Sequence, residues 1–149
     1  IPDRLAGRSG PSREPWALNE LQRAGFRAVL NVSEIEPVWS EFEKVGLDVV
    51  WIPLPNHYPA TAATEESCLR LLPKAYEFIQ KHLDARNAVL VHCAWGQDRT
   101  GLVLACHLVH TAKLSPLEAI SRVRQVRPKA ITALGWEEMS VRIFTQLQA

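Results

Sequence analysis

The chain has 149 residues, of which 47% are hydrophobic and 22% are charged. This composition excludes a collagen-like, disordered or low-complexity chain. The net charge of +1 is too small to predict electrostatic binding to nucleic acid or to an anionic membrane. The chain also lacks an apolar run near the ~18 residues of a membrane span, and its first residues lack a secretory signal pattern. We therefore expect a cytoplasmic monomer with one domain over 1–149 and no stable membrane association.

Three cysteines, Cys68, Cys93 and Cys106, are spread widely along the chain. An odd number at such spacing is unlike a disulfide framework or a paired zinc motif. We expect all three to be free thiols. Cys68 and Cys106 lie within apolar helical patterns, which favours a role as small buried core residues.

Apolar segments rich in β-branched residues alternate with segments of helical period. This alternation predicts an α/β fold, a single domain with a central, mainly parallel sheet flanked by helices. The first half is expected to contain, in chain order, a helix over 15–24, a strand over 27–32, a short helix over 38–45 and a strand over 47–53. Three prolines then predict a loop over 53–59 that contains Asn56, His57 and Tyr58.

A long helical pattern follows the loop, starting near Thr64, and Pro73 inside it predicts a kink or a restart. Residues 88–92 read as a buried strand. The segment 102–109 is apolar almost all round, so it should form the buried central helix. Ser115, Pro116 and Glu118 predict the capped start of a further helix, and the last helix is expected over 136–147.

The junction between the strand at 88–92 and the central helix reads Cys-Ala-Trp-Gly-Gln-Asp-Arg-Thr-Gly over 93–101. Backbone N–H groups in a tight loop at a helix N-terminus lack intrahelical acceptors, so they form a cradle for an oxyanion. Gly96 permits the tight backbone that such a loop needs. Arg99 supplies a planar fork of donors for two phosphate oxygens, which lysine does not match. The sequence therefore predicts an anion-binding catalytic loop.

Cys93 lies at the floor of this positive field, and it should ionise more readily than an ordinary thiol because helix N-termini and nearby cations stabilise the thiolate. Thr100 either caps the helix or donates a hydrogen bond to the Cys93 sulfur. His92 either supports the loop by hydrogen bonding or simply ends the strand. We expect Trp95 to form a solvent-facing wall of the pocket.

The segment from His92 to Gly101 matches the His-Cys-x5-Arg-Thr-Gly signature, and the chain resembles the protein tyrosine phosphatase superfamily. Segments on both sides resemble those of small atypical dual-specificity phosphatases. The resemblance implies the α/β fold of the protein tyrosine phosphatases. It also implies that the protein is a phosphoric monoester hydrolase that needs no metal or cofactor. It also implies that Cys93 forms a phosphocysteine, which water then cleaves. The phosphoryl oxygens would be bound by Arg99 and by the backbone of Ala94, Trp95, Gly96, Gln97, Asp98 and Arg99.

Members of this superfamily usually protonate the leaving oxygen with an aspartic acid from an upstream loop. Here residues 51–59 contain no Asp or Glu, and Asn56 stands at the corresponding place. Asp98 resembles the loop aspartate that is a proposed acid in myotubularins and some bacterial tyrosine phosphatases; its other reading is a carboxylate that organises the loop. His57 is the weaker candidate. The hypothesis is that Asp98 is the acid and Asn56 helps to place substrate or water.

For substrate, the resemblance favours a phosphorylated protein or peptide, with phosphotyrosine preferred and phosphoserine or phosphothreonine also accepted. Inositide phosphatases of this superfamily often carry a lysine near the loop, whereas this loop has Gln97. The alternatives are a phosphoinositide phosphatase, a phosphate-binding pseudophosphatase module with little turnover, a 5'-RNA triphosphatase and an arsenate reductase. The basic run of Arg122, Arg124, Arg127 and Lys129 could flank the pocket, but a solvated helix face is the preferred interpretation.

Overall fold

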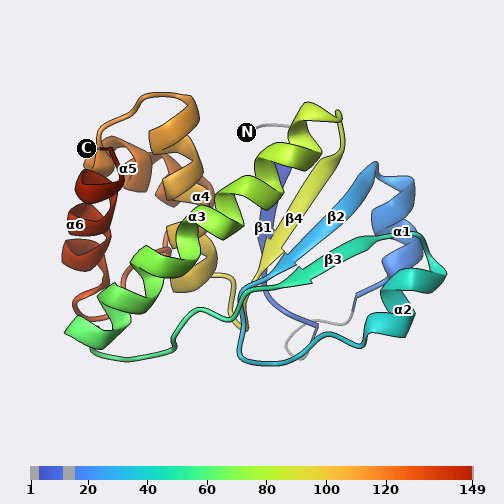
Figure 1. Cartoon of the computed structure of the whole chain (residues 1–149), viewed down its shortest axis with the longest axis horizontal. Helices are drawn as coiled ribbons and strands as arrows, with labels where there is room; N and C mark the ends of the chain where they lie inside the picture. The colour runs from blue at the N-terminus through green and yellow to red at the C-terminus, as the bar shows by residue number, and fades with distance from the viewer. Residues whose placement is uncertain (1–3, 12–15, 149) are drawn as a thin grey trace.

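The computed structural model describes residues 4–11 and 16–148, which contain a four-stranded parallel sheet with helices on both faces (Figure 1). The strands lie in the order β1-β4-β2-β3, and every neighbouring pair is parallel. Their bounds are β1 Leu5–Arg8, β2 Phe26–Asn31, β3 Asp48–Trp51 and β4 Ala88–His92. The predicted α/β fold with a mainly parallel sheet is confirmed. All four carboxyl ends therefore meet at one edge, where parallel sheets place their binding sites.

The strand β1 is missing from the sequence-based expectation. It has four residues, and only Leu5 among them is buried, so its apolar pattern is too short to stand out. Its place is set by pairing with β4, where Leu5 is level with Val89.

Side chains of β4 alternate between two cores, as the period of a strand requires. Val89 and Val91 belong to the larger core, which α3 to α6 cover. Leu90 belongs to the smaller one, between the sheet and the pair α1 and α2. His92 continues the alternation toward the smaller core, where its ring meets Trp16 edge-on at 4.6 Å between centroids.

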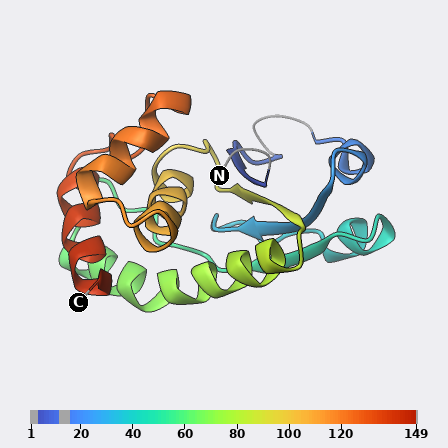
Figure 2. The same cartoon turned by 90° about the horizontal axis from the view of Figure 1, so that it is seen from above.

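The helices form two groups on the two sides of the sheet (Figure 2). Two short ones on one side are α1 Leu18–Arg23 and α2 Trp39–Lys44, and the group on the other side is α3 Ala62–Asp84, α4 Asp98–Thr111, α5 Pro116–Val126 and α6 Trp136–Gln148. Each corresponds to a predicted helix, although α1 is shorter than the expected 15–24, of which residue 15 lies outside the described residues. The capping box at Ser115 and Glu118 is confirmed.

The long helix α3 continues through Pro73, so the restart predicted there is not observed. Proline removes one backbone hydrogen bond and crowds the preceding turn. The buried side chains on both sides of it, Leu72, Ala75 and Ile79, pack in the larger core and hold the helical path. Tertiary packing therefore outweighs the local cost of the proline. Among the described residues, no helix has the length and apolar character required to cross a bilayer.

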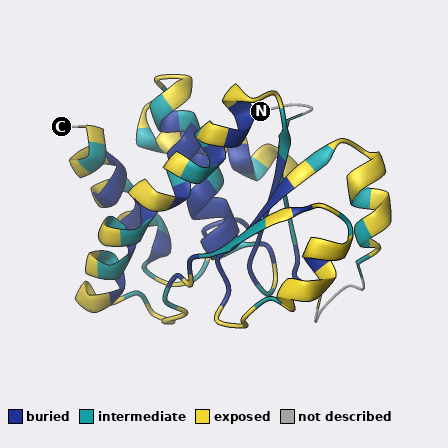
Figure 3. Ribbon diagram, turned by 45° about the vertical axis from the view of Figure 1, so that its right-hand side comes forward, coloured by how far each residue is buried: buried dark blue, intermediate teal, exposed yellow. Residues whose placement is uncertain are grey.

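The helix α4 is the buried central helix that its apolar pattern predicts (Figure 3). It begins at Asp98, four residues before the apolar segment, so its first turn contains Arg99 and Thr100. Gly101 lies against the segment after α5, where an added Cβ would meet the Cβ of Ala130 at 2.9 Å. The chain therefore passes from the loop at 93–97 directly into a helix that is packed in the core.

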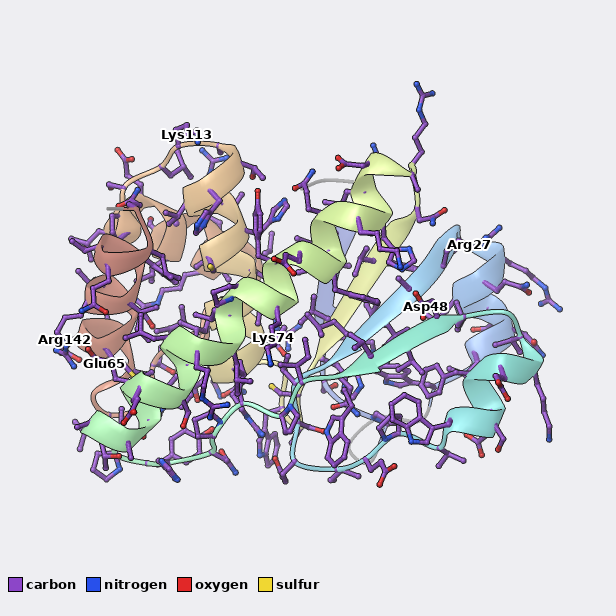
Figure 4. All side chains as sticks on the ribbon, viewed as in Figure 1. Arg27, Asp48, Glu65, Lys74, Lys113 and Arg142 are labelled. Atoms are coloured by element: carbon purple, nitrogen blue, oxygen red, sulfur yellow. The ribbon has the colours of Figure 1, made fainter. Side chains whose placement is uncertain are left out.

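At the surface, α3 and α6 are linked by an ion pair between Glu65 and Arg142 (Figure 4). The Arg142 Nη2 and Glu65 Oε1 atoms are 2.8 Å apart. Exposed pairs of this kind contribute about 0–1 kcal/mol, so the pair helps to align the two helices more than it stabilises the fold.

His107 of α4 gives the first testable prediction. It is 1% exposed, its two ring nitrogens have no hydrogen-bond partner among the described residues, and burial lowers its pKa to about 4. The unfolded chain, with a histidine pKa near ~6.5, takes up the proton first, so stability should fall as the pH drops from about 6.5 to 4. His107→Leu should remove the uptake of this one proton from the pH dependence of unfolding. It should also raise the free energy of unfolding at pH 7 by about 1 kcal/mol. Urea unfolding at several pH values measures the free energy of unfolding and its dependence on pH. The same pH dependence in His107→Leu as in the unmodified chain would contradict this prediction.

Candidate active site

The loop at 93–97 connects the end of β4 to the start of α4, at the edge where all four strands end. Gly96 has a φ of +71°, and an added Cβ there would lie 2.5 Å from the carbonyl carbon of Arg8. The Gly10 N–H donates to the Ala94 carbonyl at 2.8 Å. The residues that follow β1 therefore press against this loop, and only glycine fits at position 96.

The sulfur of Cys93 receives two hydrogen bonds, one from the loop and one from the first turn of α4. The Gly96 N–H donates to Sγ at 3.3 Å and the Thr100 hydroxyl donates at 3.1 Å. Cys93 is 2% exposed, so these donors act on the sulfur with little competition from water. Both stabilise negative charge on sulfur, at the N-terminal end of α4.

The other two cysteines differ from Cys93. All three are free thiols, as expected. Burial raises the pKa of Cys68 and of Cys106 to about 12, so both stay protonated at neutral pH. Within the described residues, only the Cys93 sulfur combines hydrogen-bond donors with a helix N-terminus.

Arg99 lies in the first turn of α4, and its side chain is 2% exposed. Its Nη1 donates to the Glu34 carboxylate, which belongs to the segment after β2. This hydrogen bond with Arg99 lowers the pKa of Glu34 below its usual range. The buried Nε of Arg99 has no partner among the described residues, so it is a donor that an oxyanion in the loop can use. The sequence analysis did not predict Glu34 as a site residue. The signal that could have indicated it is its place just after β2, the strand that pairs with β4.

Arg127, at the end of α5, holds the outer side of the loop. Its Nε donates to the Gly96 carbonyl at 2.5 Å, and its Nη2 to the Trp95 carbonyl at 3.4 Å. In a trans peptide the carbonyl and the following N–H point in opposite directions. Binding these carbonyls from outside therefore turns the N–H groups of Gly96 and Gln97 inward, and the Gly96 N–H does reach the Cys93 sulfur.

The interpretation of the basic run as a solvated face is therefore wrong for two of its members. Arg127 binds the loop, and Arg124 donates to the carbonyls of Ala130 and Ile131 and to Glu137. Periodicity places these residues near the surface, but it does not show which main-chain acceptors lie next to them.

Asp98, at the start of α4, binds the segment between α5 and α6. Its Oδ1 accepts the Thr132 N–H at 2.9 Å and the Ala133 N–H at 3.2 Å. Its Oδ2 accepts no hydrogen bond within the described residues. Asp98 Oδ1 therefore ties the start of α4 to this segment, as one of the two readings of Asp98 requires, and its role as the acid stays a prediction.

The upstream segment has Asn56 and His57 exposed. The His57 Nδ1 lies 2.7 Å from the Thr64 hydroxyl in α3, and its carbonyl accepts the Trp136 Nε1–H at 2.9 Å. Tyr58, which was not predicted as a site residue, packs its ring on Trp136 with centroids 5.8 Å apart. Burial raises the Tyr58 pKa, and the charges of Arg99, Asp98 and Cys93 also act on it. The upstream loop thus presents a neutral phenol to the site.

His92 supports the loop, which is one of its two expected roles. Its Nδ1–H donates to the Cys93 carbonyl at 3.1 Å. Burial lowers the His92 pKa to about 4, so the ring is neutral at physiological pH. Trp95 is 54% exposed, so its expected exposure to solvent is confirmed, and its role as a wall of the pocket stays a prediction.

Solved structures identify the fold as that of the protein tyrosine phosphatases. Tk-PTP in its active form is 26% identical, with a TM-score of 0.77 over 97% of this chain and 91% of that one. Human DUSP28 is 24% identical, with a TM-score of 0.76 over 100% of this chain and 93% of that one, which shows the fold alone.

Sequence comparisons identify the family. Residues 12–139 match the family described as dual specificity phosphatase, catalytic domain. Mpk3 of Drosophila melanogaster, a dual specificity protein phosphatase, is 32% identical over 109 residues, 72% of this chain and 25% of that protein. The protein tyrosine phosphatase PRL-1 of Leishmania major is 30% identical over 129 residues, 85% of this chain and 74% of that protein. The chain therefore belongs to the dual specificity phosphatase family, whose enzymes are phosphoric monoester hydrolases, and it spans about a quarter of the Mpk3 relative.

Proposed function

We propose that this chain is a cysteine-dependent protein phosphatase that hydrolyses phosphotyrosine, with phosphoserine and phosphothreonine as further substrates. The observation that carries the proposal is the Cys93 sulfur, which receives hydrogen bonds from Gly96 in the loop and from Thr100 in the first turn of α4, next to the buried Arg99. The family match and the structures similar to this chain support it.

In the first step the Cys93 thiolate attacks phosphorus, forms an S–P bond and breaks the bond to the leaving oxygen. The leaving oxygen takes a proton from Asp98 Oδ2. Arg99 and the N–H groups over 94–99 bind the three remaining phosphoryl oxygens. Water then attacks phosphorus and gives up a proton to the Asp98 carboxylate, and the S–P bond breaks to return the thiolate and release inorganic phosphate. The donors from Gly96 and Thr100 stabilise the departing sulfur.

The role of Asp98 is tested by Asp98→Asn, because asparagine keeps an oxygen that can accept the Thr132 and Ala133 N–H groups but does not supply a proton. On an alkyl phosphate, kcat should fall about 10²- to 10⁴-fold. On a nitrophenyl phosphate the loss should be much smaller, since that leaving group departs without protonation.

His57→Ala is the matched control for this test, because His57 is the other titratable candidate. It should keep a kcat on the alkyl ester within a few-fold of normal. A normal rate of Asp98→Asn on that ester would remove Asp98 from the mechanism, and a loss of about 10²-fold or more in His57→Ala would transfer the role to His57.

Arg127 should affect oxyanion binding because it holds the conformation of the loop at 93–97 through the Trp95 and Gly96 carbonyls. Arg127→Ala frees the Trp95 and Gly96 carbonyls, so we expect tungstate to inhibit about tenfold more weakly and kcat/KM to fall by about as much. Lys129→Ala removes a nearby charge without touching the loop and should change both by less than about twofold. Equal effects of the two variants would show that only net charge is involved.

A phosphoinositide phosphatase remains the second candidate. The relative that favours a lipid substrate is PTPMT1 of Arabidopsis thaliana, whose name gives phosphatidylglycerophosphate, a phospholipid without inositol, as its substrate. It is 31% identical over 75 residues, 48% of this chain and 22% of that protein. A panel of aryl phosphates, phosphopeptides and inositide vesicles distinguishes the two, and we expect the aryl phosphates and the phosphotyrosine peptides to be hydrolysed fastest. Binding of phosphate with no turnover of any substrate would instead indicate a phosphate-binding module.

A further inference from the structure

A narrow groove of about 180 Å³ adjoins the phosphate loop on the side of α2. Cys93 and Ala94 form part of one wall, and the segment that follows Glu34, including Ile35 and Val38, forms part of the other. The groove does not include the rest of the loop, from Trp95 to Arg99. It is therefore a neighbour of the phosphate cradle rather than the cradle itself.

The size of the groove limits what it can hold. Pockets for drug-sized ligands are about 300–1,000 Å³, so about 180 Å³ suits a single side chain. Because Cys93 belongs to both sites, a phosphorylated residue bound at the loop would bring a neighbouring residue of the same peptide to the groove.

Most of the lining is apolar, Asn31, Ser33 and His92 are among its polar residues, and two exposed carboxylates also line the groove. Ile35 and Val38 are 52% and 57% exposed, and Phe42, which also lines the groove, is buried. Glu36 and Glu41 are exposed and also line it. The Trp39 Nε1–H donates to Glu36 Oε2 at 2.7 Å, which orients that carboxylate and leaves Oε1 available. A largely apolar groove that is also lined by two carboxylates complements a long aliphatic stem with a cationic head.

The opposite side of the loop carries the opposite charge. A shallow depression there is lined by Gln97, Arg127 and Lys129. The groove beside α2 is lined by two carboxylates, and the depression at the end of α5 is lined by two cations. The Arg8 guanidinium also lies near the groove, 4.9 Å from the ring centroid of Trp16, which lines it. A peptide with a basic residue next to its phosphorylated residue is attracted toward the carboxylates and repelled by the cations. This difference determines the direction in which the peptide chain binds.

We propose that the groove between Cys93 and Val38 binds an arginine or lysine side chain of the phosphorylated substrate, with Glu36 and Glu41 as specificity-determining residues. This inference rests on the proposed protein phosphatase function and specifies its substrate as a phosphopeptide with a basic residue close to the phosphorylated one. The aliphatic stem packs on Ile35, Val38 and Phe42, and the cationic head meets the two carboxylates.

The test is a set of phosphotyrosine peptides with a constant serine and glycine background. Arginine, leucine or glutamate is placed at each of the three positions on either side of phosphotyrosine, and kcat/KM is divided by the value for phenyl phosphate. At one position or more on one side, arginine should exceed leucine about fivefold and exceed glutamate by a larger factor. Added salt should reduce this preference because the two carboxylates are exposed.

The double variant Glu36→Gln and Glu41→Gln should reduce the ratio of arginine to leucine to about one. Glu66→Gln is the matched control, since Glu66 is an exposed residue of α3 that does not line the groove, and it should keep the fivefold ratio. Circular dichroism and turnover of phenyl phosphate establish that each variant is folded.

Three results would overturn the inference: no position at which arginine exceeds leucine twofold, a preference for leucine, or a ratio that the double variant leaves unchanged. If phenyl phosphate and all peptides resist hydrolysis by the unmodified chain, the proposed function itself is wrong. If phenyl phosphate is hydrolysed but arginine has no effect, only the groove assignment is wrong.

Discussion

Replacing Cys93 with serine should lower the release of inorganic phosphate from an aryl phosphate by at least about 10⁴-fold. A serine hydroxyl at this place stays protonated, and the two donors that stabilise a sulfur anion do not make it a nucleophile. Inorganic phosphate and tungstate should still bind, because Arg99 and the loop N–H groups are unchanged. Phosphate release and isothermal titration with tungstate measure the two effects separately.

Two further measurements complete this prediction. Rapid quenching of the unmodified enzyme should trap phosphate on Cys93, and inorganic phosphate should protect Cys93 from alkylation by iodoacetamide. Cys106→Ala is the matched control and should remain active, because Cys106 is buried and its pKa is raised to about 12. Turnover by Cys93→Ser at more than one hundredth of the normal rate would rule out the phosphocysteine route.

Arg99→Lys should reduce kcat/KM on aryl phosphates by about 10²- to 10³-fold, although the positive charge is kept. Lysine has a single ammonium group, so it does not bind two phosphoryl oxygens and the Glu34 carboxylate in the same plane. Steady-state kinetics with phenyl phosphate, together with the inhibition constant of tungstate, measure this change.

Glu34→Gln separates the positioning of Arg99 from its charge. The amide oxygen of glutamine still accepts from Arg99 Nη1, so this variant should lose far less activity than Arg99→Lys. A rate for Arg99→Lys within tenfold of normal would show that Arg99 acts as a point charge rather than as a planar fork.

Much of the fold is readable from local patterns. The strand at β4 and the helix α4 stand out because both are apolar and buried on nearly all sides. The capping box of α5 is contained within four residues, so it too is visible in the sequence. In contrast, β1 has one buried side chain, and the course of α3 through Pro73 depends on the core that it packs against.

The sequence by itself determined the loop at 93–97 and its candidate residues, because Cys93, Gly96 and Arg99 are spaced within one short connection between a strand and a helix. Only the tertiary structure decided which groups surround that loop. Glu34 meets Arg99 across 65 residues, Arg127 reaches Gly96 across 31, and Asp98 reaches Thr132 across 34. Contacts between residues so far apart leave no periodic pattern in the sequence. They form because the parallel strands end at one edge of the sheet and because α5 and the segment after it pack on the first turn of α4.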